Sequence, residues 1–322
     1  MIAAGAALCC AGATRALIPI LKRRGVLDLP NERSSHALAT PRGGGIALTG
    51  SVLLSWLALG MGGRAPPVVI AVVLGTLVLA IVSWIDDLRG LSPALRLPAH
   101  AVAVAIGLVA LPHTVDPVAA LGPALYFAAA GLAWVWWINL FNFMDGIDGL
   151  AAGEAAAIGL GLLLFAGLGV GVDSRLAWLA AAILGAAIGF LVWNWPPARI
   201  FLGDVGSTTL GYLTGFLLLG VAFGGHWRVA LILPLYFVAD ATITLGRRLL
   251  RGERFWRAHR EHFYQRAIGH GQGHAAVTTR VIAADLMLIA CGWTAENGWG
   301  TIGLASACVT LAVLLVALAA GG

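Results

Sequence analysis

Two carboxylates directly follow an apolar stretch, where an ionised side chain near the bilayer raises the free energy unless a partner compensates for it. Asp86 and Asp87 come immediately after the apolar stretch 66–85, and the next basic residue along the chain is Arg89. An ionised carboxylate inside a bilayer costs about 2.5 to 3.5 kcal/mol even on the most lenient scale. The pair therefore predicts a nearby cation or an aqueous cavity at the edge of a membrane.

Polar side chains recur at every third position further along the chain, at Asn139, Asn142, Asp145 and Asp148. The residues between them are mostly Leu, Phe, Met and Ile, and the segment 139–152 contains no Lys or Arg. Glycines at 146 and 149 favour a break in the helix after Asp145. Two carboxylates and two amides without a cation between them are typical of a receptor for a hydrated cation or for sugar hydroxyls.

The segment 194–207 places a carboxylate at the start of another apolar stretch. Gly203 and Gly206 allow a tight backbone, and Ser207 is suited to cap a helix that begins here. The free N–H groups of such a helix start would bind a phosphate, and Asp204 would hold a magnesium ion beside it. The segment lacks the lysine and the preceding strand of a P-loop.

The segment 247–275 combines arginines, aromatics and histidines. His259 and His262 are expected side by side on one helical turn, next to Arg260, and arginines are suited to bidentate phosphate contacts. We therefore predict phosphate binding. A zinc site that adds His270 and His274 is the less favoured alternative, because no thiolate joins the four histidines.

The segment 22–42 leads into a run of glycines and contains two prolines, so it predicts an ordered turn region rather than a helix. Arg33, His36 and Arg42 are its candidates to reach an anion.

Membrane-spanning helices must position these side chains. Of the 322 residues 60% are hydrophobic and 11% charged, whereas soluble domains are about 45 to 50% apolar and about 25% charged, so a single soluble core and a disordered chain are both excluded. We predict an all-α polytopic integral membrane protein of about 11 transmembrane helices. Stretches that approach the roughly 20 residues needed to cross a bilayer are 2–21, 43–61, 66–85, 97–112, 122–138, 153–170, 175–193, 207–224, 228–246, 276–295 and 300–320.

The predicted domain organisation is one multi-span membrane domain over residues 1–322, with functional loops at 22–42, 86–96, 139–152, 194–206 and 247–275. These loops, together with Arg280, hold 16 of the 20 basic residues. Because positive charge marks the cytoplasmic side, the N-terminus is expected outside and the C-terminus in the cytoplasm. We attribute the net charge of +5 to this orientation in the membrane. No nucleic-acid partner is expected.

Taken together, the motifs resemble those of the polyprenyl-phosphate N-acetylhexosamine-1-phosphate transferases, the bacterial WecA- and MraY-like membrane enzymes of glycosyltransferase family 4. Asp240, inside the ninth stretch, also fits the pattern. The resemblance covers almost the whole chain in the family's order: Asp28-x-Pro30 to Pro41-Arg42-x-Gly44, Asp86-Asp87, Asn142-x-x-Asp145-Gly-x-Asp148-Gly149, Arg199-Ile-Phe-x-Gly203-Asp204-x-Gly206-Ser207, and the histidine-containing last loop. Each motif alone is weak, but five in order on one face are specific.

The resemblance implies an enzyme that transfers a sugar-1-phosphate from a UDP-N-acetyl sugar to undecaprenyl phosphate and releases UMP. It implies a multi-pass protein of the bacterial inner (plasma) membrane, with its active site on the cytoplasmic face and Mg²⁺ as cofactor, or Mn²⁺ in its place. Since both reactants are anions, the transfer depends on positioning and charge neutralisation. The identity of the sugar and the oligomeric state, a homodimer included, stay open.

The resemblance also implies roles for individual residues. Asp86, with Asp87 beside it, would deprotonate or orient the lipid phosphate, and Asp145 and Asp148 would lie near the metal or the sugar, which makes these four the catalytic candidates. The metal ligands would be Asp204 and Asp148. The substrate-binding candidates are Asn142, Arg199, His259, Arg260, His262, Arg33, His36 and Arg42.

The chain departs from the family pattern at two places. The family usually places a lysine and a glutamine after the aspartate pair, where this chain has Arg96 and His100. The triple histidine of the MraY-like enzymes is replaced by His259-Arg260-Glu261-His262. The second difference favours the subgroup that starts O-antigen or related surface glycans over the one that makes the peptidoglycan precursor.

A secondary transporter is the alternative from another class. Asp240 and Asp285 lie within apolar stretches, and intramembrane acids on glycine-rich helices also mark ion pathways. Transporters place charge near the bilayer midplane and carry an internal repeat, whereas the polar groups of this chain gather at one face. A CDP-alcohol phosphotransferase is disfavoured because its linked acidic pattern is absent.

Overall fold

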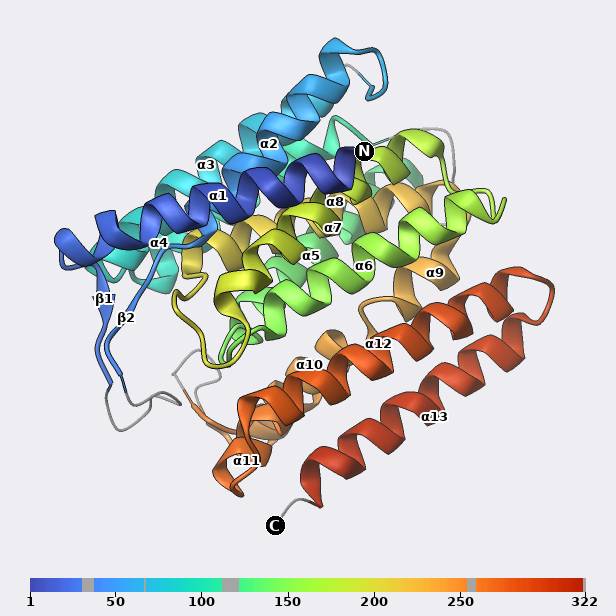
Figure 1. Ribbon diagram of the computed structural model, residues 1–322. Coiled ribbons are helices and arrows are strands. Elements are labelled where there is room, and N and C mark those ends of the chain that lie inside the picture. The colour runs from blue at the N-terminus through green and yellow to red at the C-terminus, as the bar shows by residue number, and fades with distance from the viewer. Residues whose placement is uncertain (31–37, 67, 112–121, 254–258, 321–322) are drawn as a thin grey trace.

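The computed structural model describes residues 1–30, 38–66, 68–111, 122–253 and 259–320, most of which form helices (Figure 1). Two short strands pair antiparallel between the first two helices, β1 (Leu27–Asp28) and β2 (Thr40–Pro41). The helices are α1 (Ile2–Arg23), α2 (Gly45–Met61), α3 (Val69–Arg89), α4 (Pro93–Leu108), α5 (Gly122–Phe143), α6 (Leu150–Gly167), α7 (Ser174–Asn194), α8 (Asp204–Phe223), α9 (Trp227–Ile232), α10 (Leu235–Leu250), α11 (Phe263–Gly269), α12 (His274–Glu296) and α13 (Gly300–Ala319).

Among the described residues, eight helices are long and apolar enough to cross a membrane, and α2 and α4 are shorter apolar helices. The all-α polytopic class is thereby confirmed. Ten of the predicted stretches each coincide with one helix, but the ninth, 228–246, is divided into α9 and α10 at Leu233 and Pro234. A continuous ninth span was wrong because proline lacks an N–H and clashes with the preceding helical turn. The count of eleven crossings and the orientation of the termini stay predictions.

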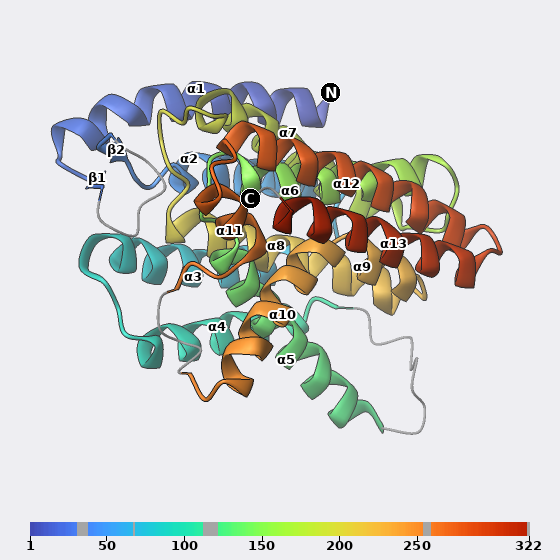
Figure 2. The same ribbon diagram turned by 90° about the horizontal axis from the view of Figure 1, so that it is seen from below.

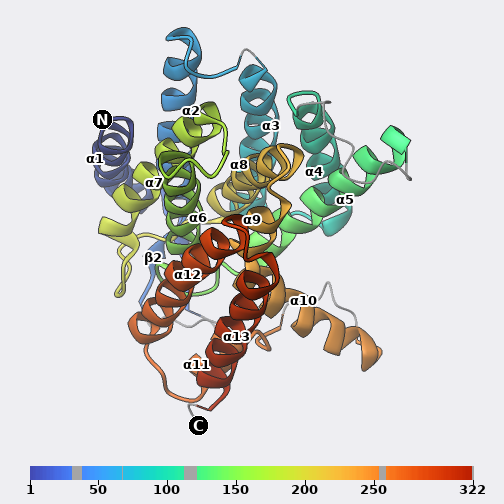
Figure 3. The same ribbon diagram turned by 90° about the vertical axis from the view of Figure 1, so that its right-hand side faces the viewer.

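Helix α8 lies at the centre of the bundle and is buried along almost its whole length (Figure 3). Its hydroxyls bind neighbouring helices: Thr208 pairs with Ser83 of α3 at 2.7 Å, and Thr209 with Thr49 of α2 at 2.6 Å. Short polar pairs and small residues hold membrane helices together where lipid provides no hydrophobic drive. These contacts fix the position of Asp204, the first residue of α8.

Helices α2 and α8 approach each other closely at two glycines, and this contact gives a prediction. A Cβ added to Gly45 would collide with the backbone of Gly206. We expect Gly45→Ala to separate the helices and cost about 1 to 3 kcal/mol, measured as earlier thermal unfolding in detergent. Gly50→Ala on the same helix is the matched control, because its Cβ would meet nothing within 4 Å. Equal unfolding temperatures for the two variants would contradict this assignment.

The segments that carry the predicted functional residues lie toward one end of the bundle (Figure 1). The Phe201 N–H donates to the Pro41 carbonyl at 2.8 Å, which joins the loop before α8 to β2. The Tyr264 hydroxyl of α11 donates to the Phe143 carbonyl at the end of α5, at 3.0 Å. In contrast, α10 projects from the rest of the bundle (Figures 2 and 3).

Candidate active site

Asp87, near the end of α3, caps the start of α8. Its fully buried carboxylate accepts hydrogen bonds from the N–H groups of Asp204, at 2.9 Å, and Val205, at 3.0 Å. Gly203 precedes the helix with φ of 75°, and a Cβ there would lie 2.8 Å from the Asp87 carboxylate. Glycine is therefore the residue that fits this position.

This cap corrects two expectations. The predicted phosphate site at the start of α8 and the predicted Ser207 cap are both wrong, because the Asp87 carboxylate takes the N–H groups of Asp204 and Val205. The Ser207 hydroxyl instead donates to the Gly203 carbonyl at 3.2 Å. A carboxylate satisfies the same donors and the same helix dipole that a phosphate would.

Arg42 and Arg96 supply the cations that the aspartate pair predicted. Arg42 Nε lies 2.7 Å from Asp87 Oδ1, and its Nη2 lies 3.3 Å from Asp204 Oδ1. Arg96 Nη1 lies 3.1 Å from Asp86 Oδ2 and 3.8 Å from Asp204 Oδ2. Arg42, predicted to reach a substrate anion, therefore already binds two carboxylates of the protein, and a nearby cation for the pair is confirmed.

Asn142 and Asp145 bring the end of α5 to this cluster. Asn142 Nδ2 donates to Asp204 Oδ1 at 3.0 Å and to the Ser207 hydroxyl at 2.8 Å. Asp145 lies in the following loop, since α5 ends at Phe143, two residues before the expected break. Burial and the neighbouring Asp204 charge raise the pKa of Asp145 well above its usual value, and Arg42 only partly opposes this. We name Asp86, Asp87, Asp145, Asp204, Arg42, Arg96 and Asn142 the carboxylate cluster.

Asp148 has a different set of partners. Its Oδ2 accepts a hydrogen bond from the Ala198 N–H at 2.9 Å, and its Oδ1 lies 3.3 Å from His274 Nδ1. Its carbonyl accepts from the Thr278 hydroxyl at 2.9 Å. Asp148 thus links the loop before α8 to α12. His274 appeared in the sequence only as part of the zinc alternative, and its spacing from Asp148 carries no signal of this contact.

Asp240 of α10 organises the histidine segment. Its buried carboxylate accepts from His262 Nδ1 at 3.0 Å and from the N–H groups of Phe263, at 3.0 Å, and Tyr264, at 3.3 Å. Helix α11 therefore begins at Phe263, and the expectation that His259 and His262 share a helical turn was wrong. Their rings nevertheless lie together, with centroids 4.9 Å apart.

Tyr264 connects the histidine pair to the loop of Asp145, since its ring centroid lies 5.7 Å from that of His262. Burial, with His262 and Arg248 nearby, lowers the pKa of His259 to about 4, so its ring is neutral at pH 7. Tyr264 connects this segment to the end of α5 through its bond to Phe143, and its hydroxyl occupies the space that a side chain at Gly146 would need. Tyr264 was missed by the sequence analysis, because nothing in the spacing marks it.

Four substrate-binding candidates remain: Arg199, Arg260, Arg33 and His36. Arg199 is exposed, with its guanidinium 5.6 Å from the ring centroid of Trp193. Arg260 is exposed between the two histidines. Arg33 and His36 lie outside the described residues.

The carboxylate cluster contains acids that could serve as one or two ligands of a hydrated divalent cation. The negative charges of neighbouring aspartates repel one another, and this repulsion contributes to the raised pKa of Asp145. A bound cation would reduce the repulsion. Within the described part of the chain, no three His, Cys, Asp or Glu side chains are grouped so that they could hold a metal ion by themselves, which applies to the four histidines and to the carboxylate cluster alike. Magnesium suits the arrangement, because it retains water and binds through one or two carboxylates together with substrate phosphates.

The fold and this cluster define a multi-pass membrane protein whose acids and arginines meet at one end of a helical bundle. Comparisons with known proteins give it a family, because residues 69–222 match the family described as glycosyl transferase family 4. The chain is 30% identical to the phospho-N-acetylmuramoyl-pentapeptide-transferase of Mycolicibacterium smegmatis, over 87% of this chain and 90% of that protein. The protein therefore belongs to glycosyl transferase family 4, and the resemblance seen in the motifs is confirmed.

Two further relatives have similar names. The probable undecaprenyl-phosphate N-acetylglucosaminyl 1-phosphate transferase of Bacillus subtilis is 29% identical, over 80% of this chain and 75% of that protein. The phospho-N-acetylmuramoyl-pentapeptide-transferase of Synechococcus is 35% identical, over 63% of this chain and 64% of that protein. The chain is thus a membrane enzyme of the phospho-sugar transferase class.

Proposed function

We propose that the protein transfers the sugar-1-phosphate of a UDP-N-acetylhexosamine, of the N-acetylglucosamine type, to undecaprenyl phosphate. The reaction takes place at the cytoplasmic face of the bacterial inner membrane and begins a surface glycan such as O-antigen. The observation that carries the proposal is the carboxylate cluster, which acids and arginines from α3, α4, α8 and two loops form at one end of the bundle. Two anions can meet at such a site only if fixed charges position them.

An apolar pocket beside the cluster supports a lipid acceptor. It has a volume of about 310 Å³ and lies between α4 and α5, with Leu97, Leu132 and Trp136 in its wall. Arg96 and Asn142 line the same pocket and also contact Asp86 and Asp204. A prenyl chain in this pocket would bring its phosphate to Arg96.

In the proposed reaction, a phosphate oxygen of the lipid attacks the β-phosphorus of the UDP-sugar. The new P–O bond joins lipid and sugar phosphates, and the bond to UMP breaks. Asp86, held by Arg96, orients the lipid phosphate or removes its remaining proton. Asp87 acts through position, since its two oxygens already bind α8 and Arg42.

We propose Asp204 as the first Mg²⁺ ligand and Asp145 as the second. Asp148, the other ligand candidate, has its contacts with Ala198 and His274, whereas Asp204 lies among Arg42, Arg96 and Asn142 of the carboxylate cluster. When bound, the ion would supply neutralisation of phosphate charge. The sugar diphosphate would be held by His259, Arg260 and His262, together with Arg199 from the loop before α8. The neutral ring of His259 would contribute a hydrogen bond.

The test is an assay of membranes that contain the protein. Incubation with undecaprenyl phosphate and UDP-N-acetylglucosamine or a related UDP-N-acetyl sugar should release UMP, and EDTA should stop the release until Mg²⁺ is restored. Membranes without the protein are the control. Release with UDP-N-acetylmuramoyl-pentapeptide alone would contradict the proposed donor, and full activity in EDTA would contradict the metal requirement.

The comparisons favour a transferase over the transporter alternative, because the relatives are named as transferases. Asp240, one of its two acids, binds His262 and the start of α11. Asp285 is buried against Glu154 of α6.

A further inference from the structure

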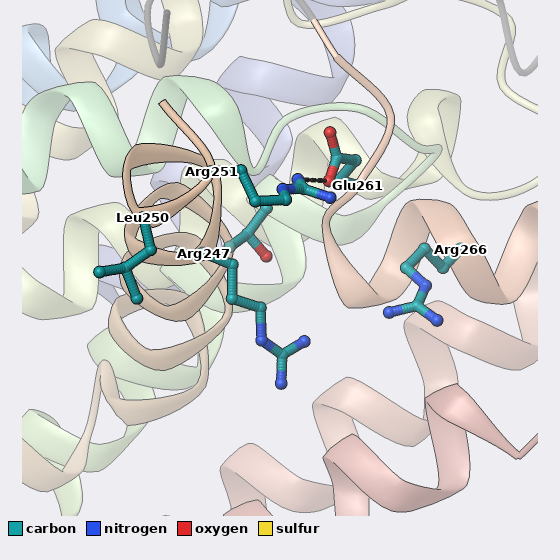
Figure 4. Close-up of a pocket in the computed structure, with 6 residues that line it drawn as sticks. Arg247, Leu250, Arg251, Glu261 and Arg266 are labelled. Carbon is teal, nitrogen blue, oxygen red and sulfur yellow. Dashed lines mark hydrogen bonds and ion pairs between the residues drawn. The ribbon is translucent and has the colours of Figure 1, made fainter. Parts of the chain in front are cut away.

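Outside the carboxylate cluster, a basic pocket lies where α10 meets α11 (Figure 4). Its volume is about 290 Å³, and its lining residues are Thr244, Arg247, Leu250, Arg251, Glu261 and Arg266. Thr244 also donates to Asp240 at 3.3 Å, so the pocket lies behind the Asp240 carboxylate that holds His262. No residue of the pocket belongs to the carboxylate cluster.

Two of the arginines are available to a ligand. Arg251 binds Glu261 and Glu253, and the buried Arg248 next to it binds the same two glutamates. Arg247 and Arg266 are exposed and make no ion pair among the described residues; the Arg247 guanidinium rests 5.2 Å from the ring centroid of Phe263. Figure 4 shows them extending from α10 and α11, while Arg251 turns to Glu261. Four arginines and two glutamates leave two positive charges, which suits one phosphate.

The pocket is also flanked by exposed apolar side chains. Leu250, in its wall, is 90% exposed and Leu249 is 62% exposed, at the end of the helix that projects from the bundle (Figure 3). Exposed apolar side chains gathered in this way are typical of a surface that a membrane or a partner protein covers. A soluble anion would use the arginines and leave the leucines uncovered, whereas a phospholipid engages both.

We propose that this pocket binds the phosphate headgroup of an anionic membrane phospholipid, with Arg247 and Arg266 as its direct contacts. A basic cluster at the end of an amphipathic helix, beside exposed leucines, is the arrangement that anionic lipids recognise. The prenyl phosphate acceptor has its own apolar pocket beside Arg96, in a different part of the bundle. The proposal therefore concerns the bilayer and not the reactants.

Retention of lipid by the purified full-length protein tests the proposal. The protein is incubated with phosphatidylglycerol in detergent, and the bound lipid is counted by native mass spectrometry. Each arginine near the surface contributes about a factor of five, so Arg247→Gln together with Arg266→Gln should weaken retention roughly 30-fold, and each single variant about 5-fold. The matched control is Arg64→Gln with Arg175→Gln, which removes two exposed charges outside the basic loops and should leave retention unchanged.

Three outcomes would overturn the proposal. The double variant could retain as much phosphatidylglycerol as wild type, or inorganic phosphate alone could displace the bound phosphatidylglycerol. In the third, the protein would retain undecaprenyl phosphate in an arginine-dependent way but would not retain phosphatidylglycerol. The last would assign the pocket to the acceptor. Lipid retention does not depend on turnover, so failure of the transfer assay leaves this test intact. Thermal unfolding of each variant in detergent shows whether the fold is retained.

Discussion

Replacing Asp204 with asparagine should abolish sugar-phosphate transfer while the protein stays folded. The carboxylate is the centre of the cluster, where Arg42, Arg96 and Asn142 converge from three segments. Loss of a charge that is worth about 4 kcal/mol in the transition state lowers the rate about 1000-fold. The measurement is UMP release by purified protein, across a titration with Mg²⁺.

Asp173→Asn is the control for this prediction. Asp173 caps the start of α7 and is exposed, and its side chain accepts a hydrogen bond from the nearby Arg175 N–H. The Asp173→Asn substitution makes the same chemical change as Asp204→Asn, at the start of a different helix. The side chains of Arg42 and Arg96 are each about one-third exposed, so water screens their ion pairs with Asp204. Asp204→Asn should therefore lower the free energy of unfolding by less than about 1 kcal/mol. If the Asp204→Asn variant keeps more than about a tenth of wild-type activity, the assignment of Asp204 as a metal ligand is wrong.

The adjacent aspartates should respond differently to the same substitution. Asp87→Asn should lower stability by about 2 to 4 kcal/mol, because an amide cannot replace a buried carboxylate that accepts two helix N–H groups and binds Arg42. Asp86→Asn should cost less stability and lower turnover, because Asp86 accepts the Leu91 N–H and pairs with Arg96, whose side chain is about one-third exposed. Thermal unfolding in detergent and UMP release separate the two effects.

A double-mutant cycle sharpens this contrast. The loss from Arg42→Gln and the loss from Asp87→Asn should be far from additive, since each removes the same 2.7 Å ion pair. The coupling between Arg96→Gln and Asp87→Asn should be smaller, because the described residues show no ion pair between the two, although both contact Asp204. Equal stability of the Asp86 and Asp87 variants would show that capping of α8 by Asp87 is unimportant.

The helical bundle was predictable because its signal is local. Each span depends on about 20 consecutive apolar residues, and ten predicted stretches coincide with helices. The broken ninth stretch shows the limit of this signal, since hydropathy averages over Pro234. The motifs also identified most residues of the carboxylate cluster, because acids at the ends of apolar stretches are too costly to be incidental.

Pairings between distant residues could not be predicted in the same way. The sequence indicated that the start of α8 offers free N–H groups, but it did not show that Asp87, from a different helix, takes them. The histidine segment presented the same difficulty, because Asp240 decides where α11 begins. Such contacts depend on how helices pack, and spacing along one chain carries no record of that.

The two buried aspartate caps have a consequence for chimeric proteins. The loop before α8 ends against an acid from α3, and the histidine loop ends against an acid from α10. Neither loop is therefore an independent module. Grafting one from a relative with a different donor preference would carry over its side chains without their anchor, so an exchange of specificity should succeed only when loop and anchoring helix are transplanted as one unit.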